Sequence, residues 1–278
     1  MSIVAWTRNQ ACFAEIEGAL SVIRKELMYV AKGKVSVVGA GPGSSKYFTR
    51  QAVEALEDCD LVIGYRLYVN QVADLVEGRG KEIIYSAMGR EIERCRHAVA
   101  EARGGRKVAL VSGGDPGIYG MAGLLLQVAQ EVDQPPEIEV IPGLTAASAA
   151  AAVLGAPLTH DFAVLSLSDL LTPWEVIEKR LRAAAEADFV IVLYNPRSKG
   201  RAELLEQTRR IILEYRSPEN AVGMVRGAGR ADEQVWRTTL SAMKPLIDQA
   251  DMATLVIVGS SKTYWQNNLM ITPRGYDL

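Results

Sequence analysis

The chain alternates short apolar runs with longer amphipathic segments, which is the pattern of an α/β protein. In the first half, runs of strand length are predicted at 35–38, 60–63, 107–111 and 137–141. Apolar residues recur at helical spacing over 47–57, 67–77, 90–103, 121–132 and 144–154. Strands that alternate with helices at this pitch predict a mostly parallel sheet covered on both faces.

The second half repeats this pattern after a break at 155–159 that contains glycine and proline. Strands are predicted at 162–167, 189–193, 221–225 and 254–258, with a helix that ends near residue 215 and a run at 235–240 that fits an antiparallel strand. Thr172, Pro173 and Glu175 predict a helix start, as N-cap, first helical residue and capping-box acid. We therefore expect two consecutive α/β domains with mostly parallel sheets, residues 34–156 and 157–278.

Residues 1–33 precede the first predicted strand. Their apolar residues follow helical spacing, which predicts an amphipathic helix over 11–30. The glycine between two lysines at 32–34 ends that pattern. We treat residues 1–33 as a helical N-terminal extension, in which we identify no chemistry.

Composition excludes several classes of protein. The 278 residues are 49% hydrophobic and 23% charged, as in ordinary globular proteins, and a net charge of -2 does not predict nucleic-acid binding. No apolar run has membrane-spanning length, and the start lacks the layout of a signal peptide. Cys12, Cys59 and Cys95 are far apart and odd in number, which favours a reducing cytoplasm over a disulfide framework. Cys95 and His97 are close, but no further cluster completes a metal site.

The first strand runs into the glycine-rich turn Gly39–Gly43. Ligands of parallel sheets bind beyond the carboxyl ends of the strands, and glycines let a ligand approach the backbone. The spacing is G-x-G-x-G, whereas dinucleotide sites use G-x-G-x-x-G. The second strand also ends in Gly64, Tyr65 and Arg66, without the acid that binds a ribose. A nicotinamide-dependent oxidoreductase is therefore a weak alternative.

Other strands end in similar turns. The turn after 107–111 contains Asp115, which could cap the next helix or receive a hydroxyl or ammonium group of a ligand. The turn after 137–141 leads into an alanine-rich helix. Its small side chains suit close packing of the helix against a sheet, or the close approach of a flat ligand to which Thr145 offers a hydroxyl. The last strand ends in a turn at residues 259–263, which we also expect to face the ligand.

Five motifs in register carry a resemblance to a known family. They are G-x-G-P-G at 39–43, G-G-D-P at 113–116, I-P-G-x-T-A at 141–146, L-Y-N-P at 193–196 and T-L-V-I-V-G at 254–259. Together they resemble the tetrapyrrole (corrin/porphyrin) methyltransferase family, two-domain S-adenosylmethionine enzymes of cobalamin and sirohaem synthesis. The resemblance covers about residues 34–278. Stretches 167–175, 194–201 and 271–276 resemble the branch that methylates C17 of precorrin-3B and contracts the macrocycle.

The resemblance implies a ligand cleft between the domains that holds S-adenosyl-L-methionine, with S-adenosyl-L-homocysteine as product. The implied contacts to this cofactor are Pro42, Gly113, Gly114, Asp115, Ile118, Thr145, Ala146, Tyr194, Asn195, Gly227 and Leu255. Substrate contacts are predicted at Gly41, Gly43, Ser112, Tyr119, Arg197, Lys199 and Arg226, and Arg201 and Arg230 could also receive substrate carboxylates.

No catalytic residue is assigned. A proton must be handled during ring contraction, and Ser112, Tyr119, Tyr194 or a water could do so. The resemblance also implies a homodimer, with a tetrapyrrole substrate and no nucleic-acid or membrane partner. Three alternatives stay open: a sister enzyme that methylates another carbon or uroporphyrinogen, a diphthamide-type methyltransferase, and a substrate with or without cobalt.

Overall fold

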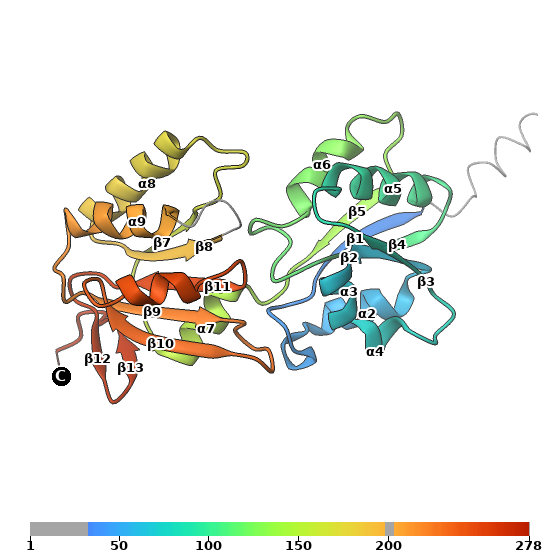
Figure 1. Cartoon of the computed structure of the whole chain (residues 1–278). Helices are drawn as coiled ribbons and strands as arrows, with labels where there is room; N and C mark the ends of the chain where they lie inside the picture. The colour runs from blue at the N-terminus through green and yellow to red at the C-terminus, as the bar shows by residue number, and fades with distance from the viewer. Residues whose placement is uncertain (1–32, 198–202, 278) are drawn as a thin grey trace, which may run out of the picture.

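The computed structural model describes residues 33–197 and 203–277 (Figure 1). The predicted N-terminal helix over 11–30, and the candidates Lys199 and Arg201, lie outside these residues.

The first sheet is fully parallel, as predicted. Its strands are β1 (Lys34–Gly39), β2 (Leu61–Tyr65), β3 (Glu82–Ser86), β4 (Lys107–Ser112) and β5 (Glu137–Ile141). Their order is β3-β2-β4-β1-β5, and each neighbouring pair is parallel. The sequence prediction missed β3, a half-exposed edge strand that lacks the continuous apolar run of the central strands.

Helices cover both faces of this sheet. One face carries α2 (Arg50–Asp58), α3 (Arg66–Gln71) and α4 (Ala73–Val76), and the other carries α5 (Glu91–Arg103) and α6 (Ala122–Ala129). Successive side chains of a strand point to opposite faces of the sheet, so the sheet has a separate hydrophobic core on each face. Val35 and Val37 pack under α5 and α6, whereas Val38 packs under α2. The single helix predicted over 67–77 is two helices, and that predicted over 47–57 begins as the 3-10 turn η1 (Ser45–Tyr47), after which Thr49 caps α2.

The second sheet is mostly antiparallel, so the prediction of a mostly parallel sheet is wrong for this half. Its order is β10-β9-β11-β8-β7, from the strands β7 (Phe162–Ser166), β8 (Val190–Tyr194), β9 (Ala221–Arg226), β10 (Gln234–Thr239) and β11 (Thr254–Val258). β7 and β8 pair in parallel, whereas β11 is antiparallel to both β8 and β9, and β10 is antiparallel to β9.

Strand direction here follows from the connections. β9 continues into β10 through residues 227–233 without the crossover helix that a parallel neighbour requires. β11 is inserted between β8 and β9 in the opposite direction, which pairs Thr254 with Arg226 and Val256 with Leu193. The start of β11 therefore lies beside the ends of β8 and β9.

Helices also cover both faces of the second sheet. α8 (Trp174–Glu186) and α9 (Leu204–Leu213) pack on one face together with the 3-10 helix η2 (Lys244–Gln249), and α7 (Ala146–Leu154) packs on the other. A small sheet joins β6 (Gly155–Ala156) to the hairpin of β12 (Tyr264–Gln266) and β13 (Leu269–Ile271). α8 begins at Trp174 with Pro173 at the N-cap and no side-chain cap bond, so the predicted Thr172 cap is wrong.

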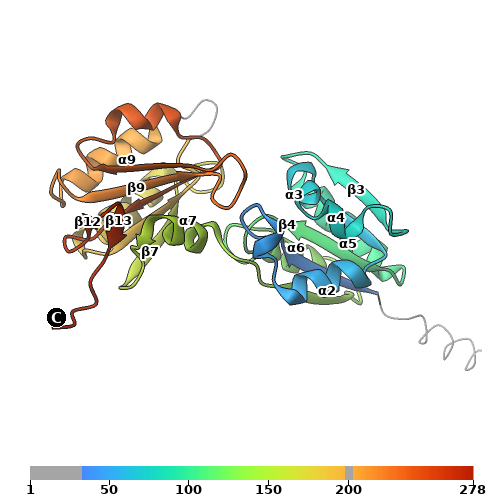
Figure 2. The same cartoon turned by 90° about the horizontal axis from the view of Figure 1, so that it is seen from below.

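The helix α7 lies against the second sheet, as Figure 2 shows from below. Its Leu154 fills the space left by the missing side chain of Gly223, where a Cβ would lie 2.4 Å from Leu154 Cδ1. We propose that the boundary between the domains falls at 142–145, between β5 and α7, rather than after the predicted residue 156.

Candidate active site

Three backbone loops meet at the carboxyl edge of the first sheet. They follow β1, β4 and β5. Gly41 N donates to Gly114 O at 3.1 Å and Gly114 N to Gly41 O at 2.8 Å. Both glycines have positive φ, 65° and 64°, a region that side chains rarely adopt. A Cβ on Gly39 would lie 2.5 Å from Gly143 N, so the loops are in direct main-chain contact.

Asp115 ties two of these loops together. Its Oδ1 accepts a hydrogen bond from Gly117 N at 2.8 Å, and its Oδ2 accepts one from Gly143 N at 3.1 Å. The cap on the next helix that the sequence allowed is absent, since Met121 occupies the N-cap of α6 without a side-chain cap bond, and Asp115 instead closes a turn with Gly117 N. A contact to a ligand stays a prediction, and the carboxylate retains lone pairs for it.

The second domain supplies the facing wall of a cleft of about 170 Å³. This wall is built from the ends of β8 and β9 and from the start of β11. The residues that line the cleft on both sides are Gly41, Pro42, Tyr68, Gly113, Gly114, Asp115, Ile118, Tyr119, Thr145, Ala146, Tyr194, Asn195, Val225, Gly227, Ala228, Arg230, Met252, Ala253, Thr254 and Leu255.

All the residues predicted to contact the methyl donor line this one cleft. They come from both domains and from segments far apart in the chain. The structure thus brings the predicted set together, although their role as ligand contacts remains a prediction.

The predicted substrate contacts divide into two groups. Gly41 and Tyr119 line the cleft, and Gly43 lies at its rim, where a Cβ would be 2.2 Å from Arg230 Cγ. Ser112 lies behind the wall, with 3% of its surface exposed, and its Oγ accepts from Met121 N at 3.4 Å.

Arg197 and Arg226 do not line the cleft and are held in ion pairs. Arg197 Nη1 lies 3.0 Å from Asp248 Oδ1. Arg226 Nε lies 2.8 Å from Asp251 Oδ2, and its Nη1 lies 3.1 Å from Asp232 Oδ2. Because these guanidiniums already have carboxylate partners, they are poorer candidates for binding a substrate acid.

The sequence prediction missed some of the cleft residues. Tyr68 packs over Gly113, where a Cβ would lie 2.3 Å from Tyr68 Cε1. The glycine at 113, which leaves room for the ring, was the only feature of the sequence that could have indicated Tyr68. Met252, Ala253 and Thr254 were missed because β11 was expected to point its carboxyl end toward the ligand. Its start lies there instead.

The turn at 259–263 consequently sits at the opposite edge of the sheet. There the hydroxyls of Ser260 and Thr263 bond each other, and Thr263 bonds Thr272 at 2.8 Å. Counting this turn with the ligand-facing strand ends was wrong.

Two tyrosines connect the domains within the cleft. Tyr119 has a positive φ of 53°, its hydroxyl donates to Val164 O at 3.2 Å, and its ring centroid lies 5.3 Å from that of Tyr194. Burial raises the pKa of the Tyr119 phenol. Strained backbone of this kind is concentrated at functional sites.

Tyr194 caps the first turn of α7. Its hydroxyl accepts from Ala147 N at 3.0 Å and shares a short hydrogen bond with Thr145 Oγ1, while Thr145 at the N-cap position makes no cap bond to the helix backbone. The phenol therefore supplies the acceptor that an N-cap side chain normally provides.

Replacing Tyr194 by phenylalanine should lower the free energy of unfolding by about 1 kcal/mol, because Ala147 N loses its acceptor. Urea unfolding followed by circular dichroism measures this change. Tyr276→Phe, at a tyrosine that is 75% exposed, serves as the control. Equal stability of both variants would contradict the capping role.

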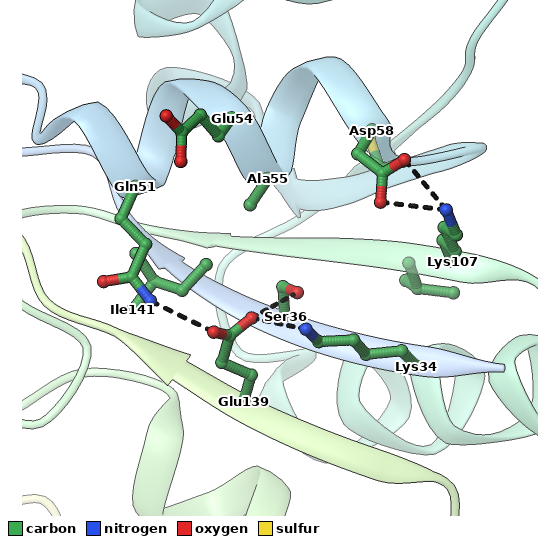
Figure 3. A pocket seen from close by; sticks show the side chains of 11 residues that line it. Lys34, Ser36, Gln51, Glu54, Ala55, Asp58, Lys107, Glu139 and Ile141 are labelled. Carbon is green, nitrogen blue, oxygen red and sulfur yellow. Dashed lines mark hydrogen bonds and ion pairs between the residues drawn. The ribbon is translucent and has the colours of Figure 1, made fainter. Parts of the chain in front are cut away.

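A larger groove of about 450 Å³ lies between α2 and the strands β1, β4 and β5 (Figure 3). Its charges are already paired: Lys34 Nζ lies 2.7 Å from Glu139 Oε2, and Lys107 Nζ lies 2.8 Å from Asp58 Oδ1. It lies away from the glycine loops, so we assign the ligand site to the smaller cleft.

Neither a metal site nor a membrane-spanning helix is found in residues 33–197 and 203–277. Within them, no group of three or more histidine, cysteine, aspartate or glutamate residues is arranged to hold a metal ion. No helix in that part of the chain combines the length and the hydropathy needed to cross a membrane.

The sequence profile of the Tetrapyrrole (Corrin/Porphyrin) Methylases matches residues 34–244. The chain belongs to this family, and it is a methyltransferase.

Individual relatives cover nearly the same region. A probable cobalt-factor III C(17)-methyltransferase of Salmonella typhimurium is 50% identical over 244 residues, which is 88% of this chain and 100% of that protein. A precorrin-3B C(17)-methyltransferase of Sinorhizobium sp is 41% identical over 260 residues, 88% of this chain and 97% of that protein.

Solved structures agree with the fold. The methyltransferase CobJ matches with a TM-score of 0.81 and 36% identity, over 87% of this chain and 100% of that one. A uroporphyrin-III C-methyl transferase from Thermus thermophilus, complexed with S-adenyl homocysteine, matches with a TM-score of 0.64 and 26% identity, over 82% and 97% of the two chains.

Proposed function

We propose that the protein transfers a methyl group from S-adenosyl-L-methionine to C17 of a precorrin-3B-type tetrapyrrole, with ring contraction, in cobalamin biosynthesis. The observation that carries this proposal is the gathering of every motif-predicted donor contact in one cleft between the domains. The names of the Salmonella and Sinorhizobium relatives support the position of methylation.

The lining fits the proposed donor. Asp115 and Arg230 are the only charged side chains among the described residues of the cleft, and Gly41, Gly113, Gly114 and Gly227 are among its lining residues. When bound, the donor supplies a methyl group on a positively charged sulfur. A largely uncharged cleft favours the loss of that charge, and glycine loops hold a ligand through backbone atoms. The Thermus relative with S-adenyl homocysteine supports the same donor class.

The chain's own contribution to the reaction would be positioning. A methyl transfer needs its carbon nucleophile about 3–3.5 Å from the methyl group, more than it needs a strong acid or base. Of the hydroxyls considered for proton transfer, those of Tyr119 and Tyr194 line the cleft, whereas Ser112 lies behind it. Both hydroxyls are engaged, since that of Tyr119 donates to Val164 O and that of Tyr194 accepts from Ala147 N, so the two tyrosines stay equal proposals for the proton carrier.

The cobalt-containing form is the substrate we favour. The Salmonella relative, named for cobalt-factor III, is 50% identical to this chain, and the Sinorhizobium relative, named for precorrin-3B, is 41% identical. We also propose a homodimer in the cytoplasm, and size-exclusion chromatography with light scattering tests the dimer.

Calorimetric titration with S-adenosylhomocysteine tests the donor, and NADPH serves as the control ligand. We expect micromolar binding of the first and none of the second. Anaerobic assays with cobalt-factor III, precorrin-3B and uroporphyrinogen III, read by mass spectrometry, then test the acceptor. Methylation of uroporphyrinogen alone would point to a sister enzyme, and no binding of S-adenosylhomocysteine would contradict the proposed reaction.

A further inference from the structure

The last residue of β7 is bonded to a side chain of the cleft. Ser166 is not itself among the lining residues, but its Oγ accepts a hydrogen bond from Asn195 Nδ2 at 2.9 Å. Asn195 directly follows β8 and lines the cleft. β7 and β8 are parallel, and Ser166 pairs with Tyr194, so both strands end at the edge of the sheet that borders the cleft.

Asn195 has a backbone conformation that its sequence position disfavours. Its φ is 52°, whereas a residue that precedes a proline, as Asn195 does, favours an extended conformation with negative φ. Asparagine tolerates a positive φ because its short side chain can bond to the backbone nearby. In the described chain the only hydrogen bond of this side chain goes instead to Ser166, 29 residues away.

Asn267 and Asn268 show the ordinary use of such a backbone. Their φ angles are 50° and 64°, and they form the two-residue turn between β12 and β13, a position where hairpins favour positive φ. No hairpin explains Asn195, since β8 and the next strand, β9, are not neighbours in the sheet. Strained backbone without such a local reason is concentrated at functional sites, held by the surrounding contacts.

Ser166 is held firmly enough to be such a contact. Its Oγ also accepts from Ser168 N at 3.2 Å, which occupies both lone pairs of the hydroxyl. Leu167, between the two serines, is fully buried, and its N donates to Tyr194 O at 2.9 Å. The acceptor that faces Asn195 is therefore fixed by the strand end itself.

This contact sets the orientation of the Asn195 carboxamide. Nδ2 and Oδ1 lie on opposite sides of Cγ, so an Nδ2 directed at β7 turns Oδ1 away from that strand. Oδ1 accepts no hydrogen bond from a described residue, and it is not among the buried side-chain atoms that lack a partner. It is thus an accessible acceptor on a residue that lines the cleft.

We infer that Ser166 is a positioning residue, which orients the Asn195 carboxamide so that Oδ1 accepts a hydrogen bond from an N–H or O–H group of the methyl donor. This inference rests on the proposed function. It adds Ser166, which belongs to none of the five motifs. An acceptor that is oriented before binding loses less conformational freedom when the ligand arrives, and this favours affinity.

The first test is calorimetric titration of Ser166→Ala and Ser166→Thr with S-adenosylhomocysteine. Ser166→Ala should weaken binding about fivefold, because Asn195 loses the partner that orients it. Ser166→Thr keeps the hydroxyl and should bind within about twofold of wild type. If Ser166→Ala does not fold, Ser166→Cys replaces it, since a thiol of similar size is a weak acceptor and should cause a similar loss.

A double-mutant cycle separates this role from a general loosening of β7. Asn195→Ala should weaken binding about tenfold. Ser166→Ala added to it should change the affinity by less than about twofold, because the carboxamide that Ser166 orients is gone. Asn195→Asp keeps an oxygen acceptor and should bind the ligand better than Asn195→Ala does.

A second ligand shows which part of the donor is bound. 5′-Methylthioadenosine has the adenosine part of S-adenosylhomocysteine but lacks its amino-acid part. If Ser166→Ala weakens binding of both ligands, Oδ1 accepts from the adenosine part. If it weakens binding of S-adenosylhomocysteine alone, Oδ1 accepts from the ammonium group.

Ser168→Ala is the matched control. The hydroxyl of Ser168 forms no hydrogen bond with any described residue, and its backbone N–H remains in the variant. It should bind both ligands as wild type does, and urea unfolding reports whether each variant is folded.

Three results would count against the inference. Wild-type affinity in folded Ser166→Ala would leave Ser166 without a role in the site, and equal losses with and without Asn195→Ala would reduce it to a support for β7. Weaker binding by Asn195→Asp than by Asn195→Ala would show that the carboxamide acts through its N–H groups. Wild-type protein that binds neither ligand would instead overturn the proposed function itself.

Discussion

Replacing Gly143 by alanine should abolish binding of S-adenosylhomocysteine and lower the free energy of unfolding by about 3 kcal/mol. A Cβ at this position would lie 2.2 Å from Gly114 O and 2.9 Å from Gly39 Cα. Both neighbours are main chain, so they cannot turn aside as a flexible side chain would. Relief requires the loops after β1, β4 and β5 to move apart, and these loops shape the cleft.

Gly123→Ala is the matched control for this substitution. Gly123 lies in α6, and a Cβ there would meet nothing within 4 Å. Alanine should therefore stabilise the protein by up to about 1 kcal/mol, without a change in ligand affinity. Urea unfolding and calorimetry measure both variants. Wild-type affinity in Gly143→Ala would show that the contact of the three loops does not govern the site.

Replacing Asp115 by alanine should weaken binding of S-adenosylhomocysteine at least about tenfold. The amides of Gly117 and Gly143 lose a charged acceptor, and each such hydrogen bond contributes about 1.5–3 kcal/mol. The loops after β4 and β5, which lie on the same wall of the cleft, then lose this side-chain link. Asp115→Asn keeps one acceptor oxygen and should bind with intermediate affinity.

Calorimetry on Asp115→Ala, Asp115→Asn and the control Asp74→Ala, at an exposed helix position, makes the comparison. Urea unfolding of the same proteins separates stability from binding. If Asp115→Ala loses stability but keeps its affinity, Asp115 is a turn residue alone, and the prediction that it contacts the donor is wrong.

The sequence by itself located most of the strands of the two large sheets, the loops at their ends and many of the residues that line the cleft. Apolar runs located β1, β2 and β4 because strands buried on both faces have little polar alternation, and the alternating residues Glu137–Ile141 located the edge strand β5. Glycine and proline at the strand ends located the loops because these residues determine local backbone conformation. Motifs from both domains located the predicted donor contacts, which the fold then brought into one cleft.

The tertiary structure alone decided strand direction and charge pairing. No local feature of the sequence distinguishes a parallel from an antiparallel β11, because the direction of a strand depends on partners that are distant in sequence. Since β11 is antiparallel, residues 252–255 at its start line the cleft, and residues 259–263 at its end do not. Arg226 ends β9 and Arg230 lies in the loop that follows, yet among the described residues only Arg226 forms ion pairs with acids. The burial of Arg94 likewise follows from packing between α5 and the β4 loop, a non-local contact that no motif encodes.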